Sequence, residues 1–152
     1  MLEIGNGRLT QQEEQAHMAI WCLMSSPLLA GNNLTAATPE LIKVLTAPGP
    51  LSVNQDELAL QGRLCGQGAD GAGGVWQAWA KPLAGGATAA LLLNRNASAP
   101  VNATVDFRAC NVSSAATVTD LWNGLKLGRH AKGWSAMVPP HSHRFVKIAP
   151  VL

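Results

Sequence analysis

Carboxylates are the side chains through which this chain could carry out acid–base or nucleophilic chemistry, since such catalysis needs groups held within reach of one substrate. They are Glu3, Glu13, Glu14, Glu40, Asp56, Glu57, Asp70, Asp106 and Asp120. Glu13 and Glu14 fall in the first turn of an expected helix, where negative charge suits the helix dipole. Asp56 and Glu57 are adjacent, so their side chains tend to diverge. Solvated surface explains each pair better than catalysis does, and we assign no catalytic residue.

The histidine and cysteine patterns favour structural roles over metal binding. His141 and His143 are separated by one residue, but no third ligand is near them in the sequence. Cys22, Cys65 and Cys110 are too few and too scattered for a disulfide scaffold or a zinc site. One or two of them are expected to be buried thiols. We therefore expect no metal site.

The stretch GQGADG, residues 66–71, matches the Gly-x-Gly-x-x-Gly pattern of dinucleotide-binding loops. That pattern requires a helix immediately afterwards, whereas the strand-like segment VWQAW follows here. We interpret the stretch as a hairpin loop.

Four tryptophans could form either a sugar-stacking platform or part of the core: Trp76, Trp79, Trp122 and Trp134. Trp76 and Trp79 differ in parity along one expected strand, so they should face opposite sides of a sheet. At least one of them should then be buried, and core packing is the favoured interpretation.

The composition is that of a globular protein with little charge. Of 152 residues, 47% are hydrophobic and 13% charged, and the net charge is +2. No run of Lys and Arg suggests nucleic acid as a partner. No segment reaches the roughly 18 apolar residues of a membrane span. No signal-peptide pattern follows Met1.

Four Asn-x-Ser/Thr triplets suggest a secretory history. Their acceptors are Asn33, Asn96, Asn102 and Asn111. A secretory protein without a signal peptide is a contradiction that a missing N-terminal part resolves. The opening MLEIGNG also resembles the end of a buried strand, so we expect Met1 to mark a cut within a longer protein.

The first sixty residues alternate between strand-like and helical patterns. A capping box at Thr10 and Glu13 opens an expected helix over residues 10–26. Its apolar stripe is Ala16, Ala19, Ile20, Leu23 and Met24, and His17 lies at the edge of that stripe. PLLAGNN then suits a buried parallel strand. TPELIKVL predicts a second helix with an apolar face of Leu41, Ile42 and Leu45. This order is typical of a slice of a larger α/β barrel or sheet.

From about residue 62 the apolar pattern changes to a period of two. Seven short segments with Gly-, Pro- and Asn-rich punctuation predict an antiparallel sandwich. In VNATVDF, the alternate residues Val101, Ala103, Val105 and Phe107 should point into the core. Asn123-Gly124 is a strong hairpin signal. The boundary between the two regions falls near residues 54–62.

Several stretches in order resemble the C-terminal part of family 27 glycoside hydrolases, the α-galactosidases and α-N-acetylgalactosaminidases. They are MLEIGNGRLTQQEEQAHMAIWCLMSSPLLAGNNL, VNQDELALQG, VWQAWAKPL, LLLNRN and DLW. The resemblance implies that residues 1–61 are the last strands and helices of a (β/α)8 barrel. Residues 62–152 would be an antiparallel β-sandwich domain.

The resemblance also implies where a sugar site would lie. Met1 matches a methionine that lines the sugar pocket, and Gly31 and Asn32 follow the last barrel strand at the barrel mouth. Asn33 stands where relatives usually have Asp. The catalytic aspartates of the family come from earlier strands and have no counterpart here. Apolar residues of the barrel portion, Ile20, Leu23, Leu28 and Leu29, should then be exposed.

Taken together, these features predict the C-terminal fragment of a retaining α-galactosidase, inactive by itself. The intact enzyme would cleave terminal α-linked galactose from oligosaccharides or glycoconjugates without a cofactor. Its partners would be the α-galactoside substrate and the missing N-terminal barrel part, not nucleic acid or a membrane. Its location would be secreted or lysosomal/vacuolar. A non-catalytic carbohydrate-binding β domain with a barrel remnant, or a purely structural stub, are the alternatives.

Overall fold

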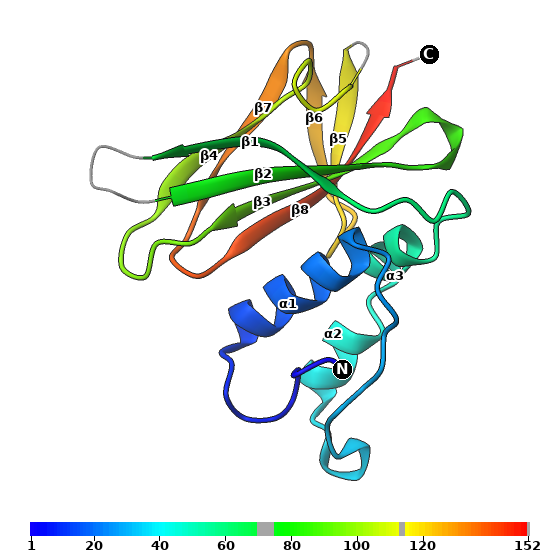
Figure 1. Cartoon of the computed structure of the whole chain (residues 1–152), viewed down its shortest axis with the longest axis vertical. Helices are drawn as coiled ribbons and strands as arrows, with labels where there is room; N and C mark the ends of the chain where they lie inside the picture. Colours follow the sequence, from blue (N-terminus) through cyan, green and yellow to red (C-terminus); the bar gives the residue numbers. More distant parts are fainter. Residues whose placement is uncertain (70–74, 113–114, 152) are drawn as a thin grey trace.

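The computed structural model describes residues 1–69, 75–112 and 115–151. Within them the chain forms three layers: helices, a large sheet and a small sheet (Figure 1). The helices are α1 (Gln11–Leu23), α2 (Pro39–Leu45) and α3 (Pro48–Asn54), with 3-10 turns at Leu34–Ala36 and Ala84–Gly86. The strands are β1 (Arg63–Ala69), β2 (Val75–Pro82), β3 (Thr88–Asn94), β4 (Val101–Asp106), β5 (Ala116–Asp120), β6 (Lys126–His130), β7 (Gly133–Val138) and β8 (His143–Pro150).

Two antiparallel sheets make up the β region. Six strands pair in the order β1-β2-β3-β8-β5-β6, and β4 pairs with β7 in the second sheet. The seven strand segments expected from the period-two pattern are all present. Asn123-Gly124 lies in the turn between β5 and β6, with Gly124 at φ +73°. The antiparallel sandwich predicted from the sequence is confirmed.

One apolar core lies between the two sheets. The expected alternation in β4 is confirmed, because Val101, Ala103, Val105 and Phe107 are at most 2% exposed. Asn102 and Asp106 are exposed on the other side of the strand. Val105 pairs with Trp134 of β7, which is itself buried. This core unites both sheets into one sandwich.

A second apolar core lies between the helices and the outer face of the large sheet. Met18 and Leu23 of α1 pack there with Leu91 of β3 and Phe145 of β8. Trp79 contacts this second core, whereas Trp76 contacts the core between the sheets. The two tryptophans therefore lie on opposite faces of β2, as their parity predicts.

This second core overturns the expectation of an exposed apolar patch. Leu23 is 1% exposed, and Ile20 and Leu28 are partly buried against the same core. Of the four residues expected to be exposed, Leu29 alone is, at 60%. The reason is that α1 packs over β3 and β8, so the helices cover the sheet of this same chain (Figure 1).

Local details differ from the sequence expectations in the helical region. Helix α1 begins after the Thr10 capping box as predicted but ends at Leu23. Helix α2 buries Leu41 and Val44, whereas Ile42 is 40% exposed. The apolar pattern of the sequence did not predict helix α3. This helix has seven residues, and the first three, Pro-Gly-Pro, are typical of a turn.

The glycine-rich stretch was partly misread as a loop. Its first residues, 66–69, lie inside strand β1 and pair with β2. Its last residues, 70 and 71, lie outside the described residues. Gly68 fits there because a Cβ at this position would meet the ring of Trp76 at 2.8 Å. Gly68 therefore makes room for an aromatic ring.

Candidate functional site

A parallel backbone bridge near the N-terminus defines the first candidate site. Leu2 pairs with Ala30, and the Leu2 N–H donates to the Leu29 carbonyl at 2.8 Å. The expected strand PLLAGNN is thus present only as this bridge. The pairing brings Met1, which precedes Leu2, and Gly31, which follows Ala30, to one common edge.

The side chain of Met1 lies against Gly31 at this edge. A Cβ on Gly31 would be 3.6 Å from both Cβ and Cε of Met1, and 2.9 Å from the Leu2 carbonyl oxygen. Met1 is 73% exposed. An exposed thioether beside a glycine is an open apolar surface that a ligand can cover.

Asn32 has the most unusual polar environment at this edge. Both Oδ1 and Nδ2 are shielded from solvent, and neither has a hydrogen-bond partner among the described residues. Its neighbour is Gly5, at φ +82°, where a Cβ would be 3.0 Å from Asn32 Nδ2. The amide therefore offers one acceptor and two donors that residues 1–69, 75–112 and 115–151 leave unpaired. We refer to Met1, Gly31 and Asn32 as the rim site.

Most of the described carboxylates accept hydrogen bonds in caps, turns or loops. Glu13 accepts from the Thr10 N–H at 2.8 Å and from the Thr10 hydroxyl at 2.9 Å. Those bonds, with the one from His141, lower the pKa of Glu13 to about 2. Glu14 accepts from the Gly5 N–H at 2.8 Å.

Three further carboxylates accept backbone N–H groups at turns. Asp56 binds Ala84, Asp106 binds Ala109, and Asp120 binds Trp122 and Asn123. Glu3 accepts from the Asn6 amide. Asp70 lies outside the described residues.

The histidines hold elements together. His141 Nδ1 lies 3.0 Å from Glu13 Oε1, which links the β7–β8 turn to the start of α1. His143 Nε2 accepts from the Trp122 indole N–H at 2.8 Å, and burial lowers the pKa of His143 to about 3. His17 stacks on Trp21 at 4.3 Å between ring centroids, and burial lowers its pKa. Within residues 1–69, 75–112 and 115–151, no group of three or more metal-binding side chains gathers.

The four tryptophans differ in how deeply they are buried in the two cores. Trp134 is 7% exposed in the core between the sheets. Trp76, Trp79 and Trp122 are half-buried and pack against one core or the other. They do not form one platform, since Trp76 and Trp79 lie on opposite faces of the large sheet.

A buried lysine joins the helices to the sheet. Lys81 of β2 is fully buried, and its ammonium group donates to the Ser25 hydroxyl at 2.6 Å and to the Val53 carbonyl at 2.5 Å. Burial lowers the pKa of Lys81, whereas the nearby Asp56 carboxylate opposes that shift. The same burial raises the pKa of the Cys22 thiol to about 12, so Cys22 is an inert buried thiol as expected.

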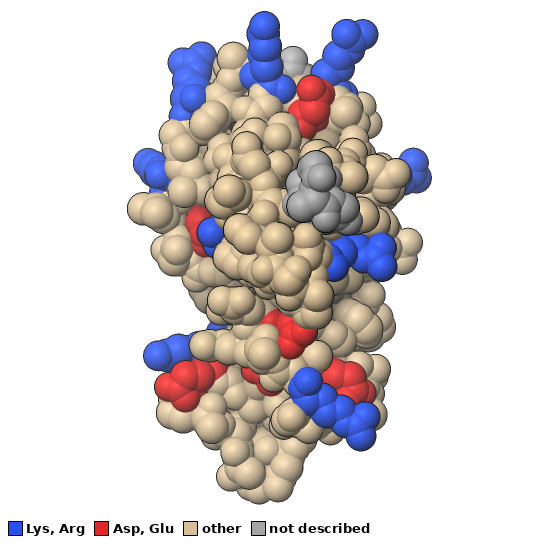
Figure 2. Space-filling view, turned by 90° about the vertical axis from the view of Figure 1, so that its left-hand side faces the viewer, with Lys and Arg blue, Asp and Glu red and all other residues tan. Residues whose placement is uncertain are grey.

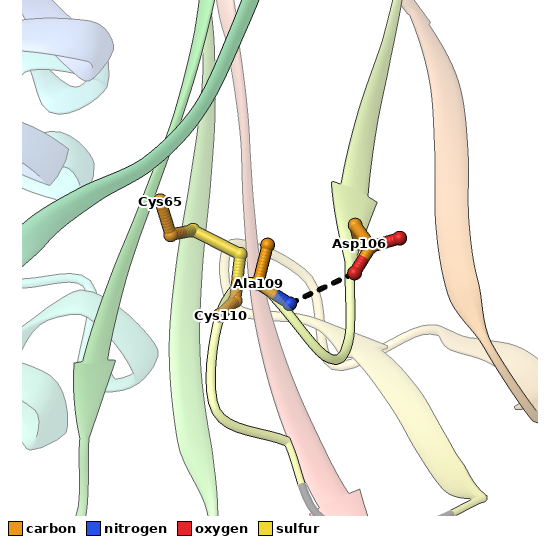
Figure 3. Close-up of a disulfide and its surroundings, with 4 residues drawn as sticks. All are labelled: Cys65, Asp106, Ala109 and Cys110. Atoms are coloured by element: carbon orange, nitrogen blue, oxygen red, sulfur yellow. Dashed lines mark hydrogen bonds between the residues drawn. A yellow bond between two sulfur atoms is a disulfide. The ribbon is translucent and has the colours of Figure 1, made fainter.

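Cys65 and Cys110 form a disulfide that sequence reasoning missed (Figure 3). It ties the edge strand β1 to the loop after β4, and the Ala109 N–H beside it donates to Asp106 at 2.8 Å. Cys65 lies within β1 and Cys110 in the loop after β4, 45 residues apart. No local pattern at that spacing signals the pairing.

The four glycosylation candidates occupy different settings. Asn33 Oδ1 accepts from the hydroxyl and N–H of Thr35, and Asn96 Oδ1 from those of Ser98. Asn102 is exposed in strand β4. Asn111 is exposed at φ +57°, and its triplet partner at position 113 lies outside the described residues.

Two family models match consecutive parts of the chain. The α-galactosidase C-terminal β-sandwich domain matches residues 73–148, and the model described as α-galactosidase A matches residues 1–56. A probable α-galactosidase of Dictyostelium discoideum is 31% identical over 99% of this chain and 39% of its own length. For α-galactosidase 3 of Arabidopsis thaliana the values are 34%, 99% and 34%.

A solved α-galactosidase structure is also similar to this chain. α-Galactosidase I of Mortierella vinacea superposes with a TM-score of 0.86 at 29% identity, over 97% of this chain and 38% of that one. The sandwich match covers half of the chain, and the sequence order agrees throughout. This chain belongs to the α-galactosidase family of glycoside hydrolases.

The chain spans well under half the length of these relatives. None of the helices in the described residues is long and apolar enough to cross a membrane.

Proposed function

We propose that this chain is the C-terminal part of a retaining α-galactosidase that cleaves terminal α-linked galactose from oligosaccharides or glycoconjugates. Residues 1–61 would complete its catalytic barrel, and residues 62–152 would form its sandwich domain. The observation that carries the proposal is the parallel bridge between Leu2 and Ala30. It lies within the region matched by an α-galactosidase model, and parallel strands are normally buried inside a larger sheet.

In the intact enzyme the rim site would contact the sugar or the strands around it. A retaining mechanism needs a carboxylate nucleophile and a carboxyl acid about 5 Å apart. Glu3, Glu13, Glu14, Asp56, Asp106 and Asp120 accept hydrogen bonds from other groups of this chain, so we place both catalytic groups in the upstream barrel. Met1 would supply apolar contact to the sugar, and the unpaired Asn32 amide would find its hydrogen-bond partners there.

A chimera tests this proposal. The region of Arabidopsis α-galactosidase 3 that precedes its matched part is joined to this chain and assayed with an aryl α-galactoside. We expect the chimera to hydrolyse the substrate and the 152-residue chain alone to show no turnover. Turnover by the chain alone, or a folded chimera that binds α-galactose without turnover, contradicts the proposal.

The asparagine triplets support a secretory route for the intact protein, secreted or lysosomal/vacuolar. We propose Asn33, Asn96, Asn102 and Asn111 as N-glycan acceptors. Secretion from a eukaryotic host behind a signal peptide, followed by glycopeptide mass spectrometry, tests each one. Ser98→Ala removes the Asn96 triplet but keeps the bonds that the backbone N–H groups of Ser98 and Ala99 donate to Asn96 Oδ1, so loss of that glycan alone is expected. Unmodified asparagines at all four positions in the secreted protein contradict the proposal.

A further inference from the structure

Charge is distributed unevenly along the chain. Residues 1–60 carry two Lys and Arg against six Asp and Glu, whereas residues 61–152 carry nine against three. The helical region is therefore net −4 and the β region net +6. Figure 2 shows basic side chains projecting from the sandwich end at the top, and most of the acidic ones on the helical part below.

The strand register places part of this positive charge on one sheet face. Thr119 of β5 pairs with Lys147 of β8 on one side and with Lys126 of β6 on the other. Thr117 pairs with Arg129 of β6. Directly paired residues of antiparallel strands point to the same side, so these side chains share a face. We call this surface, made of Thr117, Thr119, Lys126, Arg129 and Lys147, the basic face.

The basic face is the uncovered part of the outer sheet surface. Val118 lies between Thr117 and Thr119 along β5, and Ile148 follows Lys147 along β8, so both point to the opposite face of the sheet. Both are buried between the two sheets. Phe145 has the same parity as Lys147 but lies beneath the helices. Lys126, Arg129 and Lys147 are all exposed, so the layer that buries Phe145, and Ala89 beside Lys147, leaves these three side chains uncovered.

No acidic group of the described residues neutralises these three cations. The ion pair between His141 and Glu13 is the one present in residues 1–69, 75–112 and 115–151. Asp120, the one acid of β5, β6 and β8, is occupied by the backbone N–H groups of Trp122 and Asn123. The positive potential of the face is therefore directed to solvent, where it attracts anions.

We propose that the basic face binds a polysaccharide that carries carboxylate groups. Lys126 and Lys147 lie two strand spacings apart, about 10 Å, which is close to the length of two linked pyranose rings. Every ring of a polyuronate carries one carboxylate, so two carboxylates two rings apart match that separation. Thr119 lies between Lys126 and Lys147, and Thr117 lies beside Arg129, so their hydroxyls would meet sugar hydroxyls. A lipid surface fits less well, because the face offers hydroxyls and no group of large apolar side chains.

Binding of the 152-residue chain to immobilised polygalacturonate tests the proposal. The patch variant combines Lys126→Gln, Arg129→Gln and Lys147→Gln. The control variant combines Arg8→Gln, Lys43→Gln and Arg63→Gln, which removes three exposed cations elsewhere and gives the same net charge. Thermal melts verify that both variants fold.

We expect the patch variant to bind more than about tenfold more weakly than the wild type, and the control variant to stay within about threefold. Methyl-esterified polygalacturonate, with the same backbone and no charge, should not bind. Equal losses in both variants, undiminished binding to the esterified polymer, or stronger binding to phosphatidylserine vesicles than to polygalacturonate would overturn the proposal. None of these readouts involves α-galactosidase activity, so the result is independent of the chimera assay.

Discussion

The ammonium group of Lys81 donates a hydrogen bond to the Val53 carbonyl near the C-terminal end of helix α3. The last carbonyls of a helix lack partners within it, and the helix dipole favours a cation there. A residue of the sheet thus caps a helix 28 positions earlier in the chain.

Replacing this lysine should loosen the helical layer. Lys81→Met keeps much of the side-chain volume but leaves the Val53 carbonyl and the Ser25 hydroxyl without their donor. We expect a loss of about 1–3 kcal/mol in the free energy of unfolding, measured by urea denaturation. Lys147 lies in the same row of paired residues across the sheet, through Ala89, but it is exposed. Lys147→Met should therefore change the free energy of unfolding by less than about 0.5 kcal/mol. Equal effects of the two substitutions would show that the buried hydrogen bonds of Lys81 do not account for the loss of stability.

Acid should destabilise the fold through His143. Its pKa is about 3 in the folded chain and 6.5 when unperturbed, so the unfolded state binds more protons between these values. Stability therefore falls as pH drops below 6.5, by about 2 kcal/mol at pH 5. His17, whose pKa is also lowered by burial, acts in the same direction.

The variant His143→Gln isolates this contribution. An amide oxygen can still accept from the Trp122 indole, but glutamine does not titrate. Urea midpoints of the variant should change much less between pH 7 and pH 5 than those of the wild type. Glu13 does not interfere, because its ordinary pKa of 4.5 lies below this window. Parallel pH profiles for the two proteins would refute the assignment.

The disulfide should contribute strongly to stability. Cross-linking positions 45 residues apart restricts the unfolded chain by up to about 4 kcal/mol. Substituting both Cys65→Ser and Cys110→Ser should lower the urea midpoint accordingly. Dithiothreitol should lower the midpoint of the wild type and leave that of the double variant unchanged. Thiol titration shows whether dithiothreitol has reduced the disulfide. An unchanged urea midpoint in a wild type whose disulfide is reduced would contradict the prediction.

The register of β4 can be tested at two adjacent positions. Val105→Asp places a charge in the core between the sheets and should prevent folding, at a cost above about 4 kcal/mol. Thr104→Asp breaks one surface hydrogen bond to Ser135 and should cost about 1 kcal/mol. Circular dichroism and thermal melts distinguish the two outcomes, and a cooperative melt of the Val105 variant would show that the core tolerates charge there.

Local signals accounted for what the sequence predicted well. The Thr10 capping box and the alternation in β4 involve residues at most a few positions apart, so their physics is visible in a short window. The Cys65–Cys110 bond, the capping of Val53 by Lys81, and the pair of Glu13 with His141, 128 residues apart, depend on tertiary placement. The rim residues Met1, Gly31 and Asn32 came from family resemblance, whereas the lack of partners for the Asn32 amide emerged only from packing.

The place of β8 in the large sheet has a consequence for biosynthesis. The last strand of the chain lies between β3 and β5, and it also supports α1. While the ribosome is still adding residues 143–150, β3 and β5 each present an open edge, and Leu91 has no complete covering. Neither the large sheet nor the helical layer can close until residues 143–150 have been made. A premature stop codon just before His143 would therefore release a chain with two unpaired edges, which is a template for aggregation rather than a slightly shortened protein.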